Sequence, residues 1–541
     1  MIVPAGAAHA SREDLAVMSA YAQARAADNA GEAGRAAQGY AAALALMPDN
    51  DVLAARVLTQ ALQAGNRPLA VRAARRLEKS GALAPDARLL LFGEALAARN
   101  WKAARLQADG IAADEIFAFM TPVLNAWLAV ESRKGDPLAI LDAAKENPLA
   151  AAYAAEHRPF ILIARGDEPQ GVAELLATAP GSGGRASRLR IAGAAELARK
   201  GKRDAALLLL QGDDEPVVAA RRLLDARKPI PGAIGGAETG VAEFLVRIAI
   251  DLNRQDVAPL ALAFARLATF LAPDNSETWI VTSQLLGARD QQAEGLAVLA
   301  NVPAGDPFAG SVEDHRIALL VDAGNKEQAL AEAQRAVAGP SPTAADWTRL
   351  GDLNNQLKRL DEAAAAYGKA LALVESGEAG QQAWTLHLLR GGALEQAGKW
   401  PEAKAALEAA YKLAPQQPIV LNYLGYAQLE RRENIDEAMK LIALASRMQP
   451  DSAEITDSLG WAHYLRGNLP EAITLLERAV EGQPADPAIN EHLGDAYYSA
   501  GRRYEARYAW EAALLHAEEE GDAGRLRAKI QAGLTPKLAS P

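Results

Sequence analysis

The chain has 541 residues, contains no cysteine and carries a formal net charge of −11. The missing cysteine excludes disulfides, thiolate metal sites and cysteine nucleophiles. The negative charge makes nucleic acids and anionic membrane surfaces poor partners, because binding them would bring like charges together. No apolar run reaches the roughly 18 residues that a transmembrane helix needs, so the sequence predicts no transmembrane segment.

Residues 1–10 (MIVPAGAAHA) begin with an apolar stretch and end with Ala8-His9-Ala10, a small-x-small pattern that fits a secretory cleavage site. No basic segment precedes the apolar stretch, which is shorter than the core of a complete signal peptide. Two interpretations stay open: the segment is the remnant of a signal peptide, or it is a frayed, alanine-rich N-terminus.

Residues 11–227 are predicted to form degenerate helical repeats. The spacing of apolar residues predicts one helix pair over 12–47, with a break at Asn29-Ala30-Gly31, and a second over 51–80, with a break at Gly65-Asn66. From 86 to 226 the helical periodicity continues, but the regular spacing of the later repeats fades.

Residues 228–240 (KPIPGAIGGAETG) are rich in proline and glycine, which break helices. We expect a linker and a subdomain boundary here. The glycines at 181–184 follow no predicted strand, whereas a phosphate-binding glycine loop requires one, so we assign no nucleotide site to them.

The clearest pattern lies in the array predicted for residues 241–521. A Leu-Gly pair recurs with its glycine at Gly425, Gly460 and Gly494, at steps of 35 and 34 residues. Alanines and prolines recur at the same step: Ala438/Ala445, Ala472/Ala479 and Ala506/Ala513, with Pro450 and Pro484. A period near 34 residues with these offsets is the signature of the tetratricopeptide repeat (TPR), a pair of antiparallel helices that buries its apolar face by stacking on its neighbours. We therefore predict an all-α fold, a right-handed superhelical solenoid of TPR and degenerate TPR-like helix pairs.

Residues 522–534 (DAGRLRAKIQAGL) predict an amphipathic helix with a polar face. Solenoids need such a helix to cap the last repeat and keep it soluble. Residues 535–541 are predicted to be a loose tail.

No catalytic constellation is found in the sequence. The seven histidines include no pair at the i, i+4 spacing of a helical metal site, and no Gly-x-Ser-x-Gly or Walker motif occurs. His463 is interpreted as an inward-packing structural residue. We therefore expect neither enzymatic activity, nor a cofactor, nor a metal.

The first helices of the C-terminal repeats are expected to line a concave groove. Aligned on the three glycines, these helices present acids and aromatics: Asn422, Tyr426, Asp457, Trp461, Tyr464, Glu491, Asp495 and Tyr498. Aromatic anchors ringed by acids suit an extended peptide or a partner helix. Alternatively, Trp461 and Tyr426 pack between adjacent helices. The acids would repel a chain's C-terminal carboxylate.

The C-terminal third resembles a group of long bacterial envelope TPR proteins. The resemblance rests on Leu421-Asn422-Tyr423-Leu424-Gly425-Tyr426, Asp457-Ser458-Leu459-Gly460-Trp461, His492-Leu493-Gly494-Asp495 and Ala506-Arg507 with Trp510. One branch of this group is an outer-membrane lipoprotein that acts as adaptor for a periplasmic carboxy-terminal processing protease and its cell-wall hydrolase substrates. The resemblance implies a periplasmic or outer-membrane-associated location. This chain departs from that branch because it has no cysteine to lipidate.

The leading hypothesis is a non-enzymatic scaffold or adaptor of the bacterial envelope that presents its groove to partner proteins, among them an envelope protease. One alternative is a TPR subunit of a glycan synthesis, export or envelope-assembly complex. Another is a cytoplasmic TPR regulator. The sequence names neither the partner nor the oligomeric state.

Overall fold

A computed structural model describes residues 12–85, 87–339, 342–377, 382–517, 520–536 and 538. These residues form 30 α-helices and three short 3-10 helices, and they contain no β-strand. The predicted all-α solenoid of helix pairs is therefore confirmed. The proposed signal-peptide remnant at 1–10 and part of the predicted tail lie outside the described residues.

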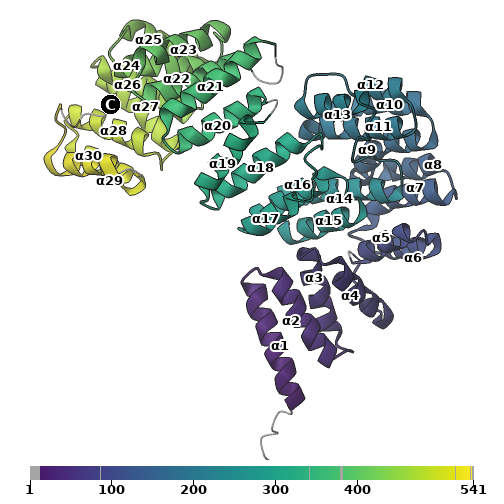
Figure 1. The fold of residues 1–541 in the computed structure, drawn as a ribbon. Helices are drawn as coiled ribbons and strands as arrows, with labels where there is room; N and C mark the ends of the chain where they lie inside the picture. The colour runs from purple at the N-terminus through teal and green to yellow at the C-terminus, as the bar shows by residue number, and fades with distance from the viewer. Residues whose placement is uncertain are drawn as a thin grey trace, which may run out of the picture. The chain divides into compact units, whose positions relative to one another are not determined.

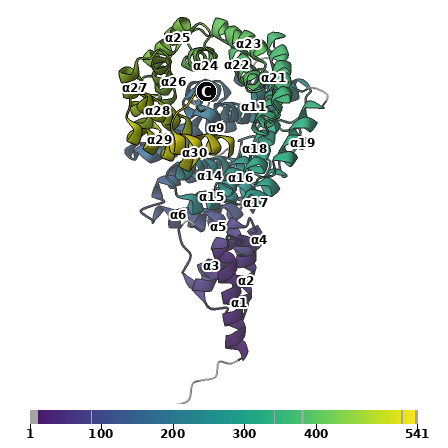
Figure 2. The ribbon, with the colours of Figure 1, turned by 90° about the vertical axis from the view of Figure 1, so that its left-hand side faces the viewer.

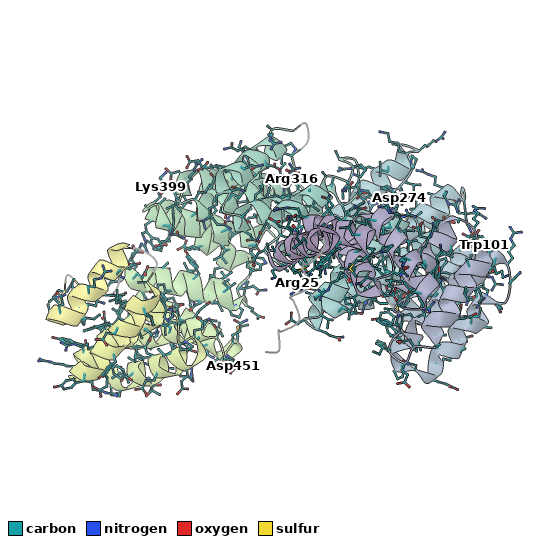
Figure 3. All side chains as sticks on the ribbon, turned by 90° about the horizontal axis from the view of Figure 1, so that it is seen from below. Arg25, Trp101, Asp274, Arg316, Lys399 and Asp451 are labelled. Atoms are coloured by element: carbon teal, nitrogen blue, oxygen red, sulfur yellow. The ribbon has the colours of Figure 1, made fainter. Side chains whose placement is uncertain are left out.

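The chain divides into two compact units, Met1–Ala329 and Leu330–Pro541. Trp101 and Asp274 mark the first unit in Figure 3, and Lys399 and Asp451 mark the second. The helices of the first unit are α1 (Arg12–Asn29), α2 (Ala33–Leu46), α3 (Asp51–Gln63), α4 (Arg67–Ser80), α5 (Arg88–Ala97), α6 (Trp101–Ala112), α7 (Thr121–Ser132), α8 (Pro137–Asp142), α9 (Pro148–Arg165), α10 (Glu168–Thr178), α11 (Ala186–Arg199), α12 (Arg203–Leu209), α13 (Glu215–Asp225), α14 (Ala237–Arg254), α15 (Ala258–Leu271), α16 (Ser276–Gly287), α17 (Gln292–Leu299) and α18 (Ala309–Asp322).

The boundary between the units falls within α19 (Lys326–Val337). The second unit continues with α20 (Ala344–Gln356), α21 (Leu360–Glu375), α22 (Ala383–Gln396), α23 (Trp400–Leu413), α24 (Pro418–Glu430), α25 (Ile435–Met448), α26 (Ala453–Leu465), α27 (Leu469–Gly482), α28 (Pro487–Ser499), α29 (Arg503–His516) and α30 (Glu520–Ala532).

Helices distant in sequence pack together in the first unit, around α14. This helix packs against α5, α7 and α9 as well as its neighbours α15 and α16 (Figure 1). The Arg67 guanidinium donates to the carbonyl of Phe270 at 3.2 Å, and that of Arg266 donates to the carbonyl of Gln63 at 3.1 Å. A simple solenoid contacts only its sequence neighbours, so this unit departs from the linear repeat pattern.

The proline- and glycine-rich segment 228–240 lies inside the first unit, whereas the division between units falls about 90 residues later along the chain. Ile230 and Ile234 are buried, and the Arg188 guanidinium donates to the carbonyl of Gly232 at 2.8 Å. The segment leads directly into α14, so its apolar side chains and its backbone are held by the core of this unit.

A buried cluster of charges connects four elements around α14. Arg185 contacts Glu156 at 2.9 Å, Glu277 at 2.8 Å and also Glu243, which is fully buried. Arg188 binds the other oxygen of Glu243 at 3.0 Å. Burial acts to lower the pKa of Arg185, but the three carboxylates outweigh it and raise the pKa well above its usual value. Because a buried charge without its partner is costly, these helices depend on one another.

The helix pairs of the second unit follow a curve in Figure 2, with α22, α24, α26 and α28 on the inner side and α23, α25 and α27 on the outer side. The repeated glycine sits where the two helices of a pair cross. A Cβ at Gly425 would lie 2.7 Å from Ile442, and one at Gly494 would lie 2.4 Å from the Trp510 ring. The repeated glycines thus permit the two helices of each pair to pack closely.

The first turn of α14 depends on a similar close approach. A Cβ at Gly240 would lie 2.1 Å from the ring of Trp127, which is fully buried. The Trp127 indole is fixed because its Nε1 donates to Nδ1 of His157 at 3.2 Å. Complete burial lowers the pKa of His157 to about 3, so this imidazole is a neutral acceptor.

We expect Gly240→Ala to destabilise the first unit by about 1–3 kcal/mol, because the new methyl group overpacks the site of Trp127. Hydrogen exchange measured by mass spectrometry should show faster exchange in α7 and α14. Gly34→Ala is the matched control, because a Cβ there has no neighbour within 4 Å and alanine favours the helix. Equal exchange in both variants would contradict the prediction.

Candidate functional site

The candidate site is a cavity of about 320 Å³ in the second unit. It is formed mainly by α24, α26 and α28, the inner helices of three successive repeats (Figure 2). Its lining residues are Glu395, Asn422, Tyr423, Tyr426, Ala427, Glu430, Glu454, Asp457, Ser458, Asp486, Ala488, Ile489 and His492. The cavity thus combines carboxylates with aromatic rings, as the sequence predicts for the groove.

The repeat period places the polar side chains of the site in register. Asn422 and Asp457 occupy equivalent positions on α24 and α26, each three residues before the repeated glycine, and His492 lies one position further along α28, two residues before Gly494. Local caps fix where two of these helices begin, since Ser452 accepts from the backbone of Ile455 in α26 and Asp486 accepts from the backbone of Ile489 in α28. The result is a polar column across the inner face.

His492 is the buried histidine of the site. Its Nδ1 lies 2.9 Å from Oδ1 of Asp457, and its side chain is almost fully buried. Burial alone would lower the pKa of His492, but Asp457 outweighs it by charge and hydrogen bonding and raises the pKa above its ordinary value. His463, interpreted from the sequence as an inward-packing residue, is partly exposed, and its Nδ1 lies 3.1 Å from Nδ2 of Asn468. His492 was missed because the alignment on the glycines pairs Asp457 with Glu491, the residue before it.

Trp461 packs between two rings. It stacks on His492 at 4.2 Å and on Tyr464 at 4.5 Å between ring centroids. Only 1% of Trp461 is exposed, and its Nε1 has no hydrogen-bond partner among the described residues. The Tyr464 hydroxyl lies 3.1 Å from that of Ser499. The sequence left two roles open for Trp461, contact with a partner in the groove and packing between helices. In the structure the ring packs between His492 and Tyr464 and does not line the cavity.

Tyr426 and Glu430 form the wall contributed by α24. Burial, together with the nearby Glu430, raises the pKa of the Tyr426 hydroxyl. Burial and the charge of Glu395 raise the pKa of the Glu430 carboxyl. The Arg431 guanidinium lies 2.5 Å from the carboxylate of Glu395 and 3.6 Å from that of Glu430. A single cation is therefore shared between two carboxylates. Glu430 is thus a desolvated carboxyl whose negative charge would be stabilised by an added cation.

Three predicted groove residues, Glu491, Asp495 and Tyr498, are engaged elsewhere. The fully buried Lys529 of α30 binds Glu491 at 2.6 Å and Asp495 at 2.7 Å. Arg525 of α30 adds two hydrogen bonds to Glu491, both 2.8 Å long. The ring of Tyr498 lies 5.6 Å from that of Trp510.

The structure therefore brings Asn422, Tyr426 and Asp457 together in the cavity, and it places Glu491 and Asp495 under α30. Tyr423, Glu395 and Glu430 line the cavity as well but were not predicted. Glu395 lies on α22, one repeat before the three that were aligned, so a longer alignment would have reached it.

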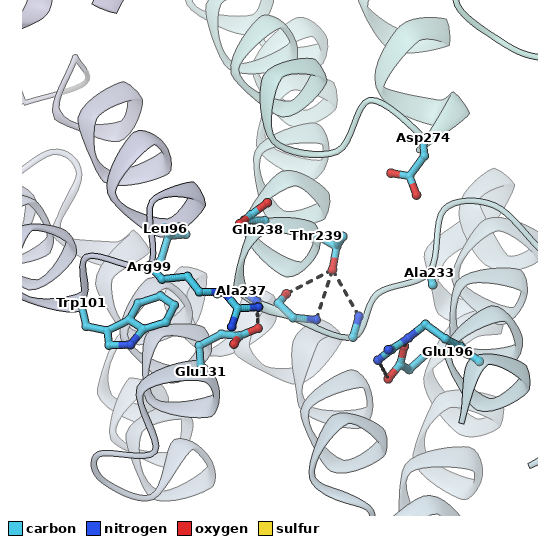
Figure 4. Close-up of a pocket in the computed structure, with 13 residues that line it drawn as sticks. Leu96, Arg99, Trp101, Glu131, Glu196, Ala233, Ala237, Glu238, Thr239 and Asp274 are labelled. Carbon is cyan, nitrogen blue, oxygen red and sulfur yellow. Dashed lines mark hydrogen bonds and ion pairs between the residues drawn. The ribbon is translucent and has the colours of Figure 1, made fainter. Parts of the chain in front are cut away.

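A cavity of about 340 Å³ in the first unit is also acidic (Figure 4). Two of its four carboxylates, those of Glu131 and Glu196, already have partners. Glu131 accepts from the backbone N–H of Ala237 at 3.4 Å, at the start of α14, and the fully buried Glu196 accepts from Arg199 at 2.7 and 2.8 Å. Thr239 holds the adjoining backbone by accepting from the N–H of Gly235 at 3.2 Å. These contacts fix the start of α14 and the segment that precedes it.

Within the described part of the chain, no group of three or more histidine and carboxylate side chains is placed to hold a metal ion. No helix built from the described residues is long and apolar enough to cross a membrane.

The His492–Asp457 pair predicts a pH dependence. Because the folded pKa of His492 is raised above its unfolded value, the pair stabilises the fold below the unfolded pKa, near 6.5. This contribution is lost as the pH rises through the folded pKa. We expect α26 and α28 to exchange hydrogen faster at pH 8.5 than at pH 6, after correction for intrinsic exchange.

His492→Gln should remove most of this pH dependence, since glutamine keeps hydrogen-bonding capacity but does not titrate. His516→Gln, at an exposed histidine on α29, is the control. An unchanged pH dependence in His492→Gln would show that another group causes it.

Models described as "Tetratricopeptide repeat" match residues 318–383 and 388–453, and one described as "TPR repeat" matches 460–501. The TPR repeat-containing protein PA4667 of Pseudomonas aeruginosa is 40% identical over 53 residues, which cover 10% of this chain and 9% of that protein. The chain thus matches less than a tenth of the length of this curated relative.

Solved structures with similar helical arrangements include Cut9 in the APC/C hetero-tetramer Cut9-Hcn1, with 15% identity, 97% of each chain covered and a TM-score of 0.39. Yeast Tom70 shows 11% identity, 96% coverage of each chain and a TM-score of 0.36. A thermophilic TPR protein of Thermus thermophilus, TTC0263, shows 21% identity over 35% of this chain and 98% of its own, with a TM-score of 0.31. The repeat models match from α19 to α28, so this part of the chain consists of tetratricopeptide repeats.

Proposed function

We propose that this protein is a scaffold whose second unit receives a basic segment of a partner protein in the cavity between α22 and α28. The observation that carries the proposal is the lining of that cavity. It contains five carboxylates, from Glu395, Glu430, Glu454, Asp457 and Asp486, and neither lysine nor arginine. A stacked TPR array generally offers its partners an extended concave surface.

A lysine or arginine side chain would find complementary groups here. Tyr423 and Tyr426 offer aromatic faces for a cation. The Oδ1 atom of Asn422, at the cavity wall, is buried and has no hydrogen-bond partner among the described residues. Glu454 is exposed at the rim and forms no ion pair among the described residues. Charge-assisted hydrogen bonds to such acceptors are the stronger kind.

Replacing Glu430 and Glu454 together by glutamine should weaken binding of a basic peptide by about tenfold or more, because charge-assisted hydrogen bonds are lost. The probe is a fluorescein-labelled octapeptide with two arginines, and fluorescence anisotropy gives the Kd. A peptide with glutamine in place of both arginines should not bind. Binding should also weaken at higher salt.

The matched control is Glu471→Gln/Glu481→Gln, which removes the same charge from exposed positions on α27 outside the cavity. If both double variants weakened peptide binding equally, the change in overall charge would explain the effect. That result would contradict a site in the cavity. Unchanged binding in Glu430→Gln/Glu454→Gln would contradict it as well.

We further propose that the scaffold works in the bacterial envelope, as an adaptor that brings partner proteins to a protease of that compartment. The support is the set of motifs around Gly425, Gly460 and Gly494 and their resemblance to envelope TPR proteins. Enzymatic activity in the assembly would then come from a partner chain.

Cell fractionation of the native host should place the protein in the periplasmic or membrane-associated fraction. Crosslinking followed by purification should recover an envelope protease with the native chain and less of it with Glu430→Gln/Glu454→Gln. A wholly cytoplasmic protein would overturn the envelope role but leave the basic-segment site to be decided by the peptide measurements.

A further inference from the structure

A larger cavity, of about 810 Å³, lies in the first unit beside the segment 228–233. It is formed by the end of α11, the start of α12, the end of α13 and this segment, with Asp274 at one side. It shares Arg199, Ala233 and Asp274 with the acidic cavity of Figure 4, so the two adjoin. Nothing in the proposed function uses this cavity.

The floor of the larger cavity is apolar. Ala195, Leu224 and Ile230 are buried beneath it, and Pro229 and Pro231 complete the wall. Its volume lies within the range of about 300–1,000 Å³ that is typical of binding pockets. An aliphatic side chain placed here would be removed from water against preformed apolar surface, which is favourable.

The rim has the opposite charge to the rest of the protein. Four cationic side chains line the cavity, those of Arg199, Arg203, Arg227 and Lys228, against one acid, Asp274. The whole chain, in contrast, carries a net charge of −11. A local concentration of positive charge on an acidic protein attracts carboxylates and steers their approach.

Two of these cations are available to a ligand. Arg199 is held by Glu196, and Arg203 donates to Asp225 at 2.6 Å and to the carbonyl of Leu224. Arg227 and Lys228, in contrast, are exposed, and their side chains form no ion pair or hydrogen bond among the described residues. They stand next to Pro229, at the edge of the apolar floor.

The segment that carries Arg227 and Lys228 is held by hydrogen bonds to α13 and α11. The backbone N–H of Lys228 donates to the carbonyl of Leu223 at 2.9 Å, and Arg188 holds the carbonyl of Gly232 at 2.8 Å. Pro229 and Pro231 have fixed φ angles. Because this segment is already ordered, binding a ligand would cost little conformational entropy of the protein.

We infer that this cavity is a second peptide-binding site, which takes an extended segment with an aliphatic side chain next to a carboxylate. The aliphatic side chain lies on the floor formed by Leu224 and Ile230. The carboxylate lies at the rim, against Arg227 and Lys228. The carboxylate belongs either to an aspartate or glutamate side chain or to the C-terminus of the partner chain. This site differs in unit and in ligand charge from the cavity between α22 and α28.

The test uses the full chain and three fluorescein-labelled peptides. The first, Gly-Ser-Asp-Leu-Leu-Glu-Gly-Ser, is amidated at its C-terminus, so its carboxylates are side chains only. The second is also amidated and has asparagine and glutamine in place of the acids. The third has these neutral residues and ends in Leu-Leu with a free C-terminal carboxylate. Anisotropy titrations give the Kd of each.

We expect the first or the third peptide to bind and the second to bind at least tenfold more weakly. Binding of the first identifies a side-chain carboxylate, and binding of the third identifies a chain terminus. Arg227→Glu/Lys228→Glu should weaken the tighter peptide at least tenfold, and Arg227→Gln/Lys228→Gln should weaken it by an intermediate factor. Higher salt should weaken it too.

The matched control is Arg75→Glu/Lys79→Glu, which makes the same charge change at exposed positions of α4, outside this cavity. Hydrogen exchange in α11 and α13 confirms that each variant is folded. The proposal is overturned if the neutral peptide binds as tightly as the others, if no peptide binds, or if the control weakens binding as much as the reversal at 227 and 228. None of these results depends on the basic-peptide site of the second unit.

Discussion

The close crossing of the two helices in each repeat is the constraint from which the second unit follows. At Gly494 the backbone of α28 approaches Trp510 of α29 so closely that a Cβ would lie 2.4 Å from the ring. Ala506 and Ala513 are also fully buried, and their small side chains allow the neighbouring helices to pack closely. Because the crossing recurs at steps of 35 and 34 residues, residues with the same offset from these glycines occupy equivalent positions on the inner face. The alignment of Asn422 with Asp457 follows from that step, whereas His492 lies one residue beyond the equivalent position, which Glu491 holds.

The first unit depends on a different interaction. Its helices diverge from the repeat pattern, and α14 is surrounded by elements from distant parts of the sequence. Arg185 and Glu243 are charged groups inside this core, and each would be costly without the other. Such a cluster gives no periodic signal in the sequence. The array predicted for 241–521 therefore could not reveal that α14 packs against α7 and α9.

The sequence predicted the helix pairs and the inner position of the C-terminal acids and aromatics, since periodicity and spacing are local properties. It could not decide between binding and packing for Trp461. That outcome depends on His492, which stacks on the indole from the next repeat at 4.2 Å. It also could not show which acids are neutralised within the chain. Glu491 and Asp495 resemble Asp457 in the alignment, but only the structure shows Lys529 between them.

The position of the candidate site follows from how these acids are paired. On α28, α30 supplies Lys529 and Arg525, so the acids there stabilise the helix packing and are closed to a partner. On α26, the carboxylate of Asp457 is paired with the imidazole of His492 from α28. On α24, Glu430 accepts a hydrogen bond from Tyr426. The guanidinium of Arg431 lies closer to Glu395 than to Glu430, and burial raises the pKa of the Glu430 carboxyl. Among Glu491, Asp495, Asp457 and Glu430, pairing within the chain therefore weakens from α28 to α24, and a basic partner segment would supply the missing cation most readily to Glu430.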